Sequence, residues 1–353
     1  MEMLTEGQSK RQDRERVLKI LRAYAWNSMA YLSLEDDKHW FFSQQVEGVA
    51  SYALSHGVMV VCGDPVCAKN DMPAFLCELK EFASEHQYRM VFLFANGEFL
   101  PMYRSAGFGT TAIGEEAVFD LCTWNLHGGR VAKVRAAVNH AKKAGLVVKE
   151  YVPSRKRDKC IENEFSEISR LWLAQKHTAP LKFALGDIGF DFPNDKRYFY
   201  ALSREGVMQG FIVFLPYRRA TAYMADVTRR RPDAIYGTTE LVFCESLSRF
   251  QEERIATASL GVAPLANVTA TWRRKGFQLL CKYIYRHMNC IYGFRQLHAA
   301  KEKYAPTRWE RVFIVSHPAL LSPKMSYATA DVLDSKGFHD YVDAFLKHHA
   351  TMM

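Results

Sequence analysis

The order of expected secondary-structure elements occurs twice along the chain, and this repeat constrains the fold more than any single motif does. In the first half, residues 46–61 read as a β-hairpin around the turn "SHG". An amphipathic helix is expected over about 72–86, with Asp71 as N-cap and Pro73 in its first turn. A buried strand "RMVFLFA", a short helix "EFLPMYRSAG" and a strand pair around "FGTTAIGEEAVFDL" follow.

The second half repeats this order with different residues. A helix over about 163–176 precedes three expected strands, "YFYALSREG", "VMQGFIVFLPYR" and "TAYMADVTR". A helix "TTELVFCESLSRFQEER", a strand "IATASLGVA", a helix "FRQLHAAKEKY" and a strand "WERVFIVSH" complete the set. The repeat lies in the pattern and not in residue identity.

An antiparallel meander followed by strand, helix and strand is the element order of the GNAT acyltransferase fold. We therefore predict an α/β (α+β) protein with tandem GNAT-like lobes, each a mixed sheet flanked by helices. The predicted boundaries are 1–126 for the N-terminal lobe, 127–148 for a basic connecting helix and 149–353 for the C-terminal lobe, which carries the expected active site.

Composition limits the function without choosing it. The 353 residues are 48% hydrophobic, and 47 Lys+Arg against 38 Asp+Glu give a net charge of +9, which suits RNA or an anionic membrane as partner. The eight cysteines form no C-x-x-C pair and the histidines complete no zinc-finger spacing, so we expect no metal site and a reducing compartment. No signal peptide or membrane-spanning run is recognisable, which predicts a soluble, cytoplasmic chain.

The connecting segment "HGGRVAKVRAAVNHAKKAGLVV" has one apolar helical face and no acidic residue. A linker helix with a solvated charged side would explain this pattern, and so would a surface that faces phosphates. The basic or titratable side chains on its other faces are Arg130, Lys133, Arg135, His140, Lys142 and Lys143.

The stretch "TAYMADVTRRRPDAIYGTTEL" at 221–241 places an acid, a cluster of cations and a helix start close together. In a GNAT lobe such a strand splays from its neighbour, and the amides of the next helix point into the gap. Asp226 would accept a proton from an attacking hydroxyl or orient an α-ammonium, and Arg229 would hold a phosphate. Thr238 or its neighbour would cap the helix. A purely structural Asp226–Arg229 pair is the alternative.

Cations gather again in "LHAAKEKYAPTRWER", where Lys301 and Lys303 end a helix and Arg311 follows in a strand. Such cations can bind a substrate phosphate, or they can simply complement the helix dipole.

Several short motifs resemble the catalytic domain of the phosphatidylglycerol lysyltransferase family, the cytosolic C-terminal part of the bacterial multiple peptide resistance factors. The resemblance covers about residues 16 to 316 and depends on the order and spacing of its motifs. They are "GDPV" at 63–66, "YRSAGF" at 103–108, "GEEAVFDL" at 114–121, "VRAAVNHAKKAGL" at 134–146, "DVTRRRPDAIYGTTEL" at 226–241, "SLGVAPL" at 259–265 and "YGFRQLHAAKEKYAP" at 292–306.

The resemblance implies a dual-GNAT enzyme that takes an amino acid from aminoacyl-tRNA and esterifies it onto a lipid hydroxyl, typically of phosphatidylglycerol. Together with the residue pattern, it predicts catalytic Asp226 and Arg229 and no cofactor beyond the aminoacyl-tRNA co-substrate. The expected tRNA-binding residues on the connecting helix are Arg130, Lys133, Arg135, Lys142 and Lys143. The expected substrate-binding residues are Glu240, Thr238, Lys301, Lys303 and Arg311. Two departures are that Glu240 stands where the family has Asp, and that the membrane-embedded N-terminal region of the family is missing.

Two other functions fit parts of the sequence. A CoA-dependent acetyltransferase usually has several glycines before the corresponding helix, whereas "RRRPDAIYGTTE" has one. A non-catalytic RNA- or membrane-binding module would use the basic surface alone.

The N-terminal "KRQDRERVLKILRAYAW" combines basic and apolar residues at helical spacing. It predicts either a packing helix of the first lobe or an interfacial amphipathic helix that brings the chain to the inner face of the cell membrane.

Overall fold

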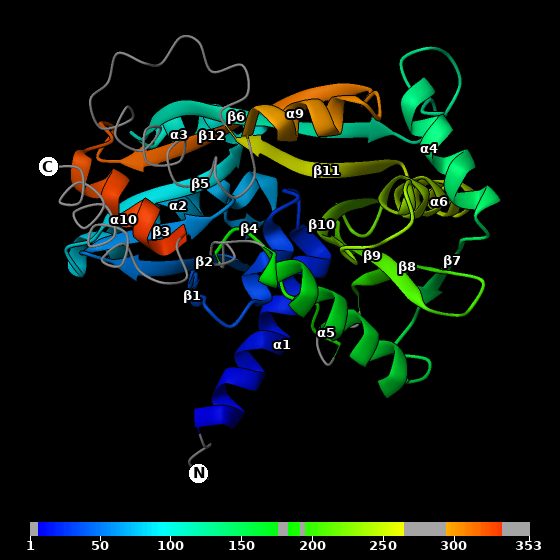
Figure 1. Cartoon of the computed structure of the whole chain (residues 1–353). Coiled ribbons are helices and arrows are strands. Elements are labelled where there is room, and N and C mark those ends of the chain that lie inside the picture. Colours follow the sequence, from blue (N-terminus) through cyan, green and yellow to red (C-terminus); the bar gives the residue numbers. More distant parts are fainter. Residues whose placement is uncertain (1–5, 176–182, 191–194, 265–293, 334–353) are drawn as a thin grey trace, which may run out of the picture.

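One mixed β-sheet connects the two halves of the sequence. The computed structural model describes residues 6–175, 183–190, 195–264 and 294–333, and its strands form a 12-stranded sheet with helices on both faces (Figure 1). The first half contains α1 (Glu6–Tyr24), η1 (Ala30–Leu34), β1 (His39–Phe42), β2 (Gly48–Ser55), β3 (Val58–Cys62), β4 (Val66–Cys67), η2 (Lys69–Asp71), α2 (Met72–Glu85), β5 (Arg89–Asn96), η3 (Gly97–Phe99), α3 (Leu100–Ser105) and β6 (Gly109–Asp120).

The second half repeats the central part of this order, in which three strands are followed by a helix, a strand, a helix and a strand. It contains α4 (Ala132–Lys143), β7 (Val147–Tyr151), α5 (Lys159–Ala174), β8 (Arg197–Leu202), β9 (Met208–Tyr217), β10 (Ala222–Arg230), α6 (Thr238–Glu252), β11 (Thr257–Pro264), α9 (Phe294–Glu302), β12 (Arg308–His317) and α10 (Pro323–Leu333). The mixed α/β, GNAT-like fold expected from the repeat is confirmed.

Three local expectations need correction. The strand pair expected around "FGTTAIGEEAVFDL" is the single strand β6, because β6 pairs along its length with β12 and, over its second half, with β11. Strand β7 was not recognised, since it is short and half exposed at the sheet edge. Asp71 occupies the N-cap position of α2, but its side chain makes no capping hydrogen bond.

The sheet is continuous because the halves exchange their last strands. Its order is β1-β2-β3-β5-β12-β6-β11-β10-β9-β8-β7, so β12 lies between β5 and β6 while β6 lies between β12 and β11. Only β3–β5 and β10–β11 pair in parallel among the described strands. The boundaries at residues 126 and 148 stay a prediction, but a cut there would separate strands that pair in this sheet.

Helices α1 and α4 both bury an apolar face. Val17 and Leu21 of α1 are fully buried in a core cluster that also includes side chains of η1, β3 and α10. This favours the packing-helix interpretation of the N-terminal segment. Val134 and Val138 of α4 pack in another cluster with side chains of α6, and the two helices lie together at one end of the molecule (Figure 1).

The gap between the parallel strands of the first half is closed by hydrogen bonds. β3 and β5 pair up to Cys62 and Leu93, and Asp64 follows two residues later. Its buried carboxylate accepts from Nδ2 of Asn27 at 2.7 Å, the amide of Asn96 at 2.9 Å and the hydroxyl of Tyr103 at 3.0 Å. Burial raises the pKa of Asp64 to about 6, although these hydrogen bonds oppose the rise. These hydrogen bonds therefore close the first half at the position where the two parallel strands of a GNAT lobe separate.

Replacing Asp64 should destabilise the fold strongly. Asp64→Ala removes one acceptor from three donors, two of them on buried side chains, and we expect a loss of roughly 2–5 kcal/mol in the free energy of unfolding, measured by urea titration. The control is Asp36→Ala, because the Asp36 side chain is 79% exposed in its ion pair with Arg14 and should contribute less than about 0.5 kcal/mol. Equal losses in the two variants would contradict the stabilising role of the hydrogen bonds to Asp64.

Candidate active site at the splay of β10 and β11

In the second half the corresponding parallel strands do separate. β10 and β11 pair at Ala222–Thr257, Tyr223–Ala258 and Met224–Ser259, and no further pair follows. The registers of both strands with their other neighbours shift just beyond this point, between Ala225 and Val227 in β10 and after Ser259 in β11. These irregularities open the sheet and place Asp226 at the splay.

Asp226 is half-buried, and its carboxylate has few direct hydrogen bonds to described residues. Both of its oxygens accept from the amide of Gly186, at 3.2 and 3.1 Å. Burial raises the pKa of Asp226 to about 6, whereas the charge of Lys196 and the Gly186 hydrogen bond lower it. Glu35 adds to the rise and Arg229 opposes it. The carboxylate is therefore mostly ionised at neutral pH and remains basic enough to accept a proton.

Gly186 is required by this close approach. A Cβ atom at this position would lie 2.2 Å from Oδ2 of Asp226 and 3.1 Å from Oε1 of Glu35. Any side chain would therefore displace Asp226 or break its hydrogen bonds.

Lys196 and Glu35 are site residues that the sequence interpretation missed. The Lys196 ammonium is buried and donates to Oε1 of Glu35 at 3.1 Å and to the carbonyl of Asp187 at 2.7 Å. Glu35 ends η1 in the first half, 161 residues from Lys196. No local pattern links residues so far apart, so only the fold brings them together.

Arg229 lies on the same strand as Asp226, and its guanidinium carbon is 5.5 Å from the ring centre of Trp172 in α5. Its charge helps to lower the pKa of Asp226. The predicted proximity of this acid and this cation is therefore present in the structure.

Lys301 lies in a second buried ionic cluster, on the other side of the splay. Its ammonium donates to the carbonyls of Gly261 at 2.9 Å and Val262 at 2.7 Å, where β11 is irregular. Burial lowers the pKa of Lys301 to about 7, and the charge of Glu116 opposes this shift. Glu116 of β6 in turn accepts hydrogen bonds from Ser28 and Ser259. Lys301 thus binds the backbone of β11. The sequence had instead predicted that it binds a substrate phosphate.

The remaining predicted substrate-binding residues are separate from Asp226 in the described contacts. Glu240, in the first turn of α6, accepts from the ammonium of Lys303 at 2.6 Å. Thr238 is buried and donates its hydroxyl to the carbonyl of Ile235, so it is not a side-chain cap. Arg311 is exposed in β12, opposite Glu115 of β6.

The N-cap of α6 is Gly237, with φ +88°. A Cβ there would lie 2.1 Å from the carbonyl oxygen of Ala137 in α4. The α4 backbone therefore covers this side of the turn before α6, where a CoA-binding loop would need open backbone for a pyrophosphate.

The five predicted tRNA-binding residues differ in their environment. Arg135 donates to the carbonyls of Leu126 and Gly128, which fixes the loop before α4. Arg130 pairs with Glu302 at 3.1 Å and Lys142 with Glu245 at 2.6 Å. Lys133 and Lys143 are exposed and form no ion pair with other described residues.

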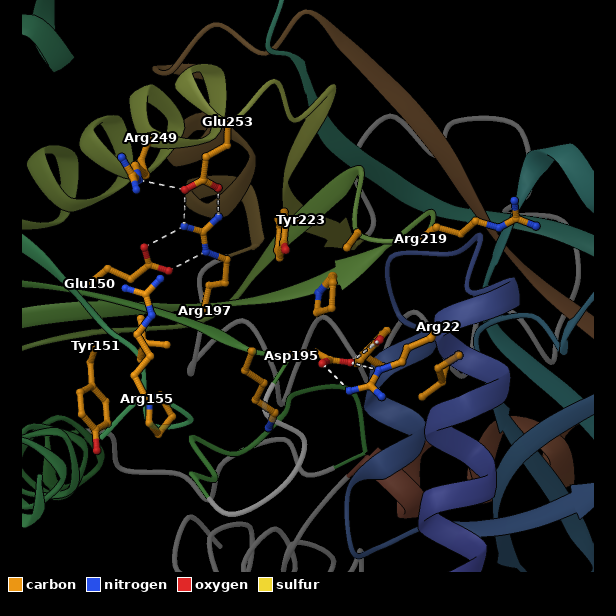
Figure 2. Close-up of a pocket in the computed structure, with 17 residues that line it drawn as sticks. Arg22, Glu150, Tyr151, Arg155, Asp195, Arg197, Arg219, Tyr223, Arg249 and Glu253 are labelled. Atoms are coloured by element: carbon orange, nitrogen blue, oxygen red, sulfur yellow. Dashed lines mark hydrogen bonds and ion pairs between the residues drawn. The ribbon is translucent and has the colours of Figure 1, made fainter. Parts of the chain in front are cut away.

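A pocket of about 580 Å³ lies near the beginning of β10 and includes Lys196 in its lining (Figure 2). Arg22 of α1 and Asp195 form a two-point ion pair on one wall, with 2.7 Å for each hydrogen bond. Arg197 on another wall is bound by Glu150 and Glu253. Lys196 lines the pocket as well as contacting Glu35, so it connects the pocket with the carboxylate at the splay.

No group of three or more His, Cys, Asp or Glu side chains in the described ranges could hold a metal ion. Within the same ranges, every helix is too short or too polar to cross a membrane.

The two parallel strand pairs, the meanders before them and the splay beyond Met224 define a protein with a GNAT-like acyltransferase fold. The chain belongs to the family described as phosphatidylglycerol lysyltransferase, C-terminal, whose model matches residues 18–316.

Two relatives are named phosphatidylglycerol lysyltransferase. The protein from Bacillus subtilis (strain 168) is 26% identical over 294 residues, which is 83% of this chain and 34% of the relative. That from Staphylococcus epidermidis (strain ATCC 12228) is 24% identical over 296 residues, which is 84% of this chain and 35% of the relative. The chain therefore spans about a third of the length of the relatives it matches.

Solved structures share the fold. L-PGS from Bacillus licheniformis superposes with a TM-score of 0.79 at 24% identity, covering 90% of this chain and 96% of that one. The C-terminal domain of a putative lysylphosphatidylglycerol synthetase from Agrobacterium fabrum gives 0.77 at 23% identity, covering 91% and 96%. FemX gives 0.53 at 10% identity, covering 93% and 99%.

Neutralising Asp226 should stabilise the protein at neutral pH. The folded-state pKa of about 6 lies above the ordinary 3.8, so the ionised carboxylate destabilises the fold above pH 6, by at most about 3 kcal/mol. This penalty decreases as the pH falls from 6 to 4 and is absent below. Asp226→Asn should therefore raise the melting temperature at pH 7.5 and change it little at pH 4. A melting temperature lowered at pH 7.5 would contradict the assignment of burial as the dominant cause.

Proposed function

We propose that this chain transfers an amino acid from aminoacyl-tRNA to the hydroxyl group of a lipid acceptor, with phosphatidylglycerol as the first candidate. The observation that carries the proposal is the Asp226 carboxylate, whose pKa is raised to about 6 at the open splay of β10 and β11. Family membership and the name that the relatives bear support this reaction class.

The proposed transfer reaction requires a proton acceptor for the attacking hydroxyl group. The acceptor hydroxyl attacks the carbonyl carbon of the aminoacyl ester, and the bond from that carbon to the tRNA ribose oxygen breaks. Asp226 takes the hydroxyl proton and returns a proton to the leaving ribose oxygen. Because the ester is already activated, positioning and charge stabilisation suffice, and the proposal includes no cofactor.

The cations at the site have distinct proposed roles. Arg229, close enough to Asp226 to lower its pKa, would hold a phosphate of the donor or the acceptor. Lys301 would keep β11 apart from β10 through its two backbone hydrogen bonds. Substrate contact by Glu240, Thr238, Lys303 and Arg311 remains part of the proposal, with the Glu240–Lys303 pair at the start of α6 as its centre.

The partners follow from the reaction. We place the tRNA on α4 and the acceptor in the inner leaflet of the cell membrane, where a cytoplasmic protein would meet it peripherally. Support for the RNA surface is the set of exposed cations on α4, which has no acidic residue between Ala132 and Lys143.

The decisive experiment measures transfer with a purified chain, labelled aminoacyl-tRNA and phosphatidylglycerol vesicles, with mass spectrometry of the extracted lipid. Asp226→Asn should lower the single-turnover rate by roughly 10²–10⁴-fold while tRNA affinity is kept. Arg229→Lys should also be slow, since a point charge does not replace a planar guanidinium. Near-full activity of Asp226→Asn would show that Asp226 is not the proton acceptor.

The pH dependence provides an independent check on Asp226. Because the carboxylate must be ionised to accept a proton, the wild-type rate should rise with pH through a midpoint near 6 and then level off. The residual rate of Asp226→Asn should lack this step. A profile without a midpoint between about pH 5 and 7 would contradict the role.

Charge reversal on α4 should weaken tRNA binding. Lys133→Glu with Lys143→Glu removes two exposed cations that form no described ion pair, so affinity should fall and its dependence on salt should become less steep. Filter binding between low and moderate salt measures both quantities. Lys324→Glu, an exposed lysine of α10 at the other end of the molecule, is the control (Figure 1). Equal effects of the two changes would remove α4 from the RNA surface.

A further inference from the structure

An exposed aromatic ring lies beside the basic helix. Tyr236 is 66% exposed and is the one aromatic residue among the described large hydrophobic side chains that are exposed. Buried tyrosines such as Tyr198 and Tyr217 are ordinary core residues, whereas the Tyr236 ring keeps most of its apolar surface in water.

The ring is held in place although it is open. The backbone carbonyl of Tyr236 lies 3.1 Å from Nδ1 of His140 in α4, and the two rings meet edge to face, with centres 5.5 Å apart at 75°. The next residue, Gly237, packs tightly against the backbone of Ala137. The position of Tyr236 is therefore fixed by contacts of its carbonyl and of the following residue with α4, while most of its ring stays exposed.

Basic side chains lie on the helix that this ring contacts. Lys133 and Lys143 are exposed on one side of α4, roughly 15 Å apart at the rise of an α-helix, and His140, which meets the ring, lies between them in sequence. Arg230, at the end of β10, is exposed on the chain segment that leads to Tyr236. An aromatic face beside a row of cations is the arrangement that binds single-stranded nucleic acid, because bases stack on the ring while phosphates contact the cations.

We propose that Tyr236 is a stacking platform for a base of single-stranded RNA at the 3′ end of the tRNA donor, and that Lys133 and Lys143 contact the adjoining phosphates. This rests on the proposed function and names the part of the partner that is recognised at this surface. Tyr236 lies between the end of β10 and the start of α6, the same end of β10 at which the splay opens beyond Met224. Tyr236 thus lies on the segment that joins the strand bearing Asp226 to α6.

Stacking and phosphate contact predict different behaviour, which makes the proposal testable. The probes are an RNA hairpin with a short single-stranded 3′ tail and the same hairpin with a blunt end. Tyr236→Ala should weaken binding of the tailed hairpin about 5- to 100-fold, with an unchanged salt dependence and unchanged binding of the blunt hairpin. Tyr236→Phe should bind like the wild type, because the ring face is kept.

The other variants separate the alternatives. Lys133→Glu with Lys143→Glu should weaken binding of the tailed hairpin and reduce its salt dependence, the opposite signature to Tyr236→Ala. Leu320→Ala is the matched control, since Leu320 is 69% exposed at another surface. Thermal unfolding should be nearly the same for Tyr236→Ala, Leu320→Ala and the wild type.

Three results would overturn the proposal: wild-type affinity of Tyr236→Ala for the tailed hairpin, an equal loss on the blunt hairpin, or no binding of either hairpin by the wild type. Loss of phosphatidylglycerol-vesicle binding in Tyr236→Ala, with RNA binding kept, would assign the ring to a lipid surface instead. If aminoacyl transfer fails but the tailed hairpin is still preferred in a Tyr236-dependent way, the transferase function is contradicted and the stacking role of Tyr236 is kept.

Discussion

The exchange of β6 and β12 between the halves is the constraint on which the site depends. Through it, Glu116 of β6 lies against β11, where it accepts from Ser259 and helps to keep a buried charge on Lys301. Ser28, just before η1, binds the same carboxylate. The segment that ends at Glu35 is thereby tied to the sheet at the splay. The first half is therefore joined to the site by the hydrogen-bonded pairing of β6 with β11 and β12.

The two halves use the same position in opposite ways. Asp64 follows the last parallel pair of β3 and β5 by two residues, as Asp226 follows that of β10 and β11. Burial raises the pKa of both carboxylates to about 6. Asp64 accepts from three donors and is closed off, whereas the described hydrogen bonds of Asp226 come from one backbone amide. The second splay is thus the one equipped for chemistry.

Sequence periodicity predicted most helices and strands, because amphipathic spacing and turn residues are local signals. It also predicted Asp226 and Arg229 as site residues, which a strand end and a helix start mark within one short stretch. It could not find Glu35, Lys196 or Gly186, since the hydrogen bond between Gly186 and Asp226 joins residues 40 apart and that between Lys196 and Glu35 joins residues 161 apart. It recognised Lys301 as a cation but not as a buried one, because its burial follows from the strand exchange. The register of the strands and their pairing over long sequence distances cannot be predicted from a local stretch of sequence.

The basicity of Asp226 is set jointly by both halves. Its own half provides the burial, the Gly186 amide and the charges of Lys196 and Arg229, while Glu35 comes from the first half. Since Lys196 also binds Glu35, the cation that favours the ionised Asp226 is held by an acid that disfavours it. Moving Glu35 would therefore change the pKa of Asp226 both directly and through Lys196. A carboxylate with a pKa near 6 is mostly ionised at neutral pH and can still accept a proton. A carboxylate in a surface salt bridge has a lower pKa and is a weaker proton acceptor. The first half therefore contributes to the electrostatics of Asp226, because it provides Glu35.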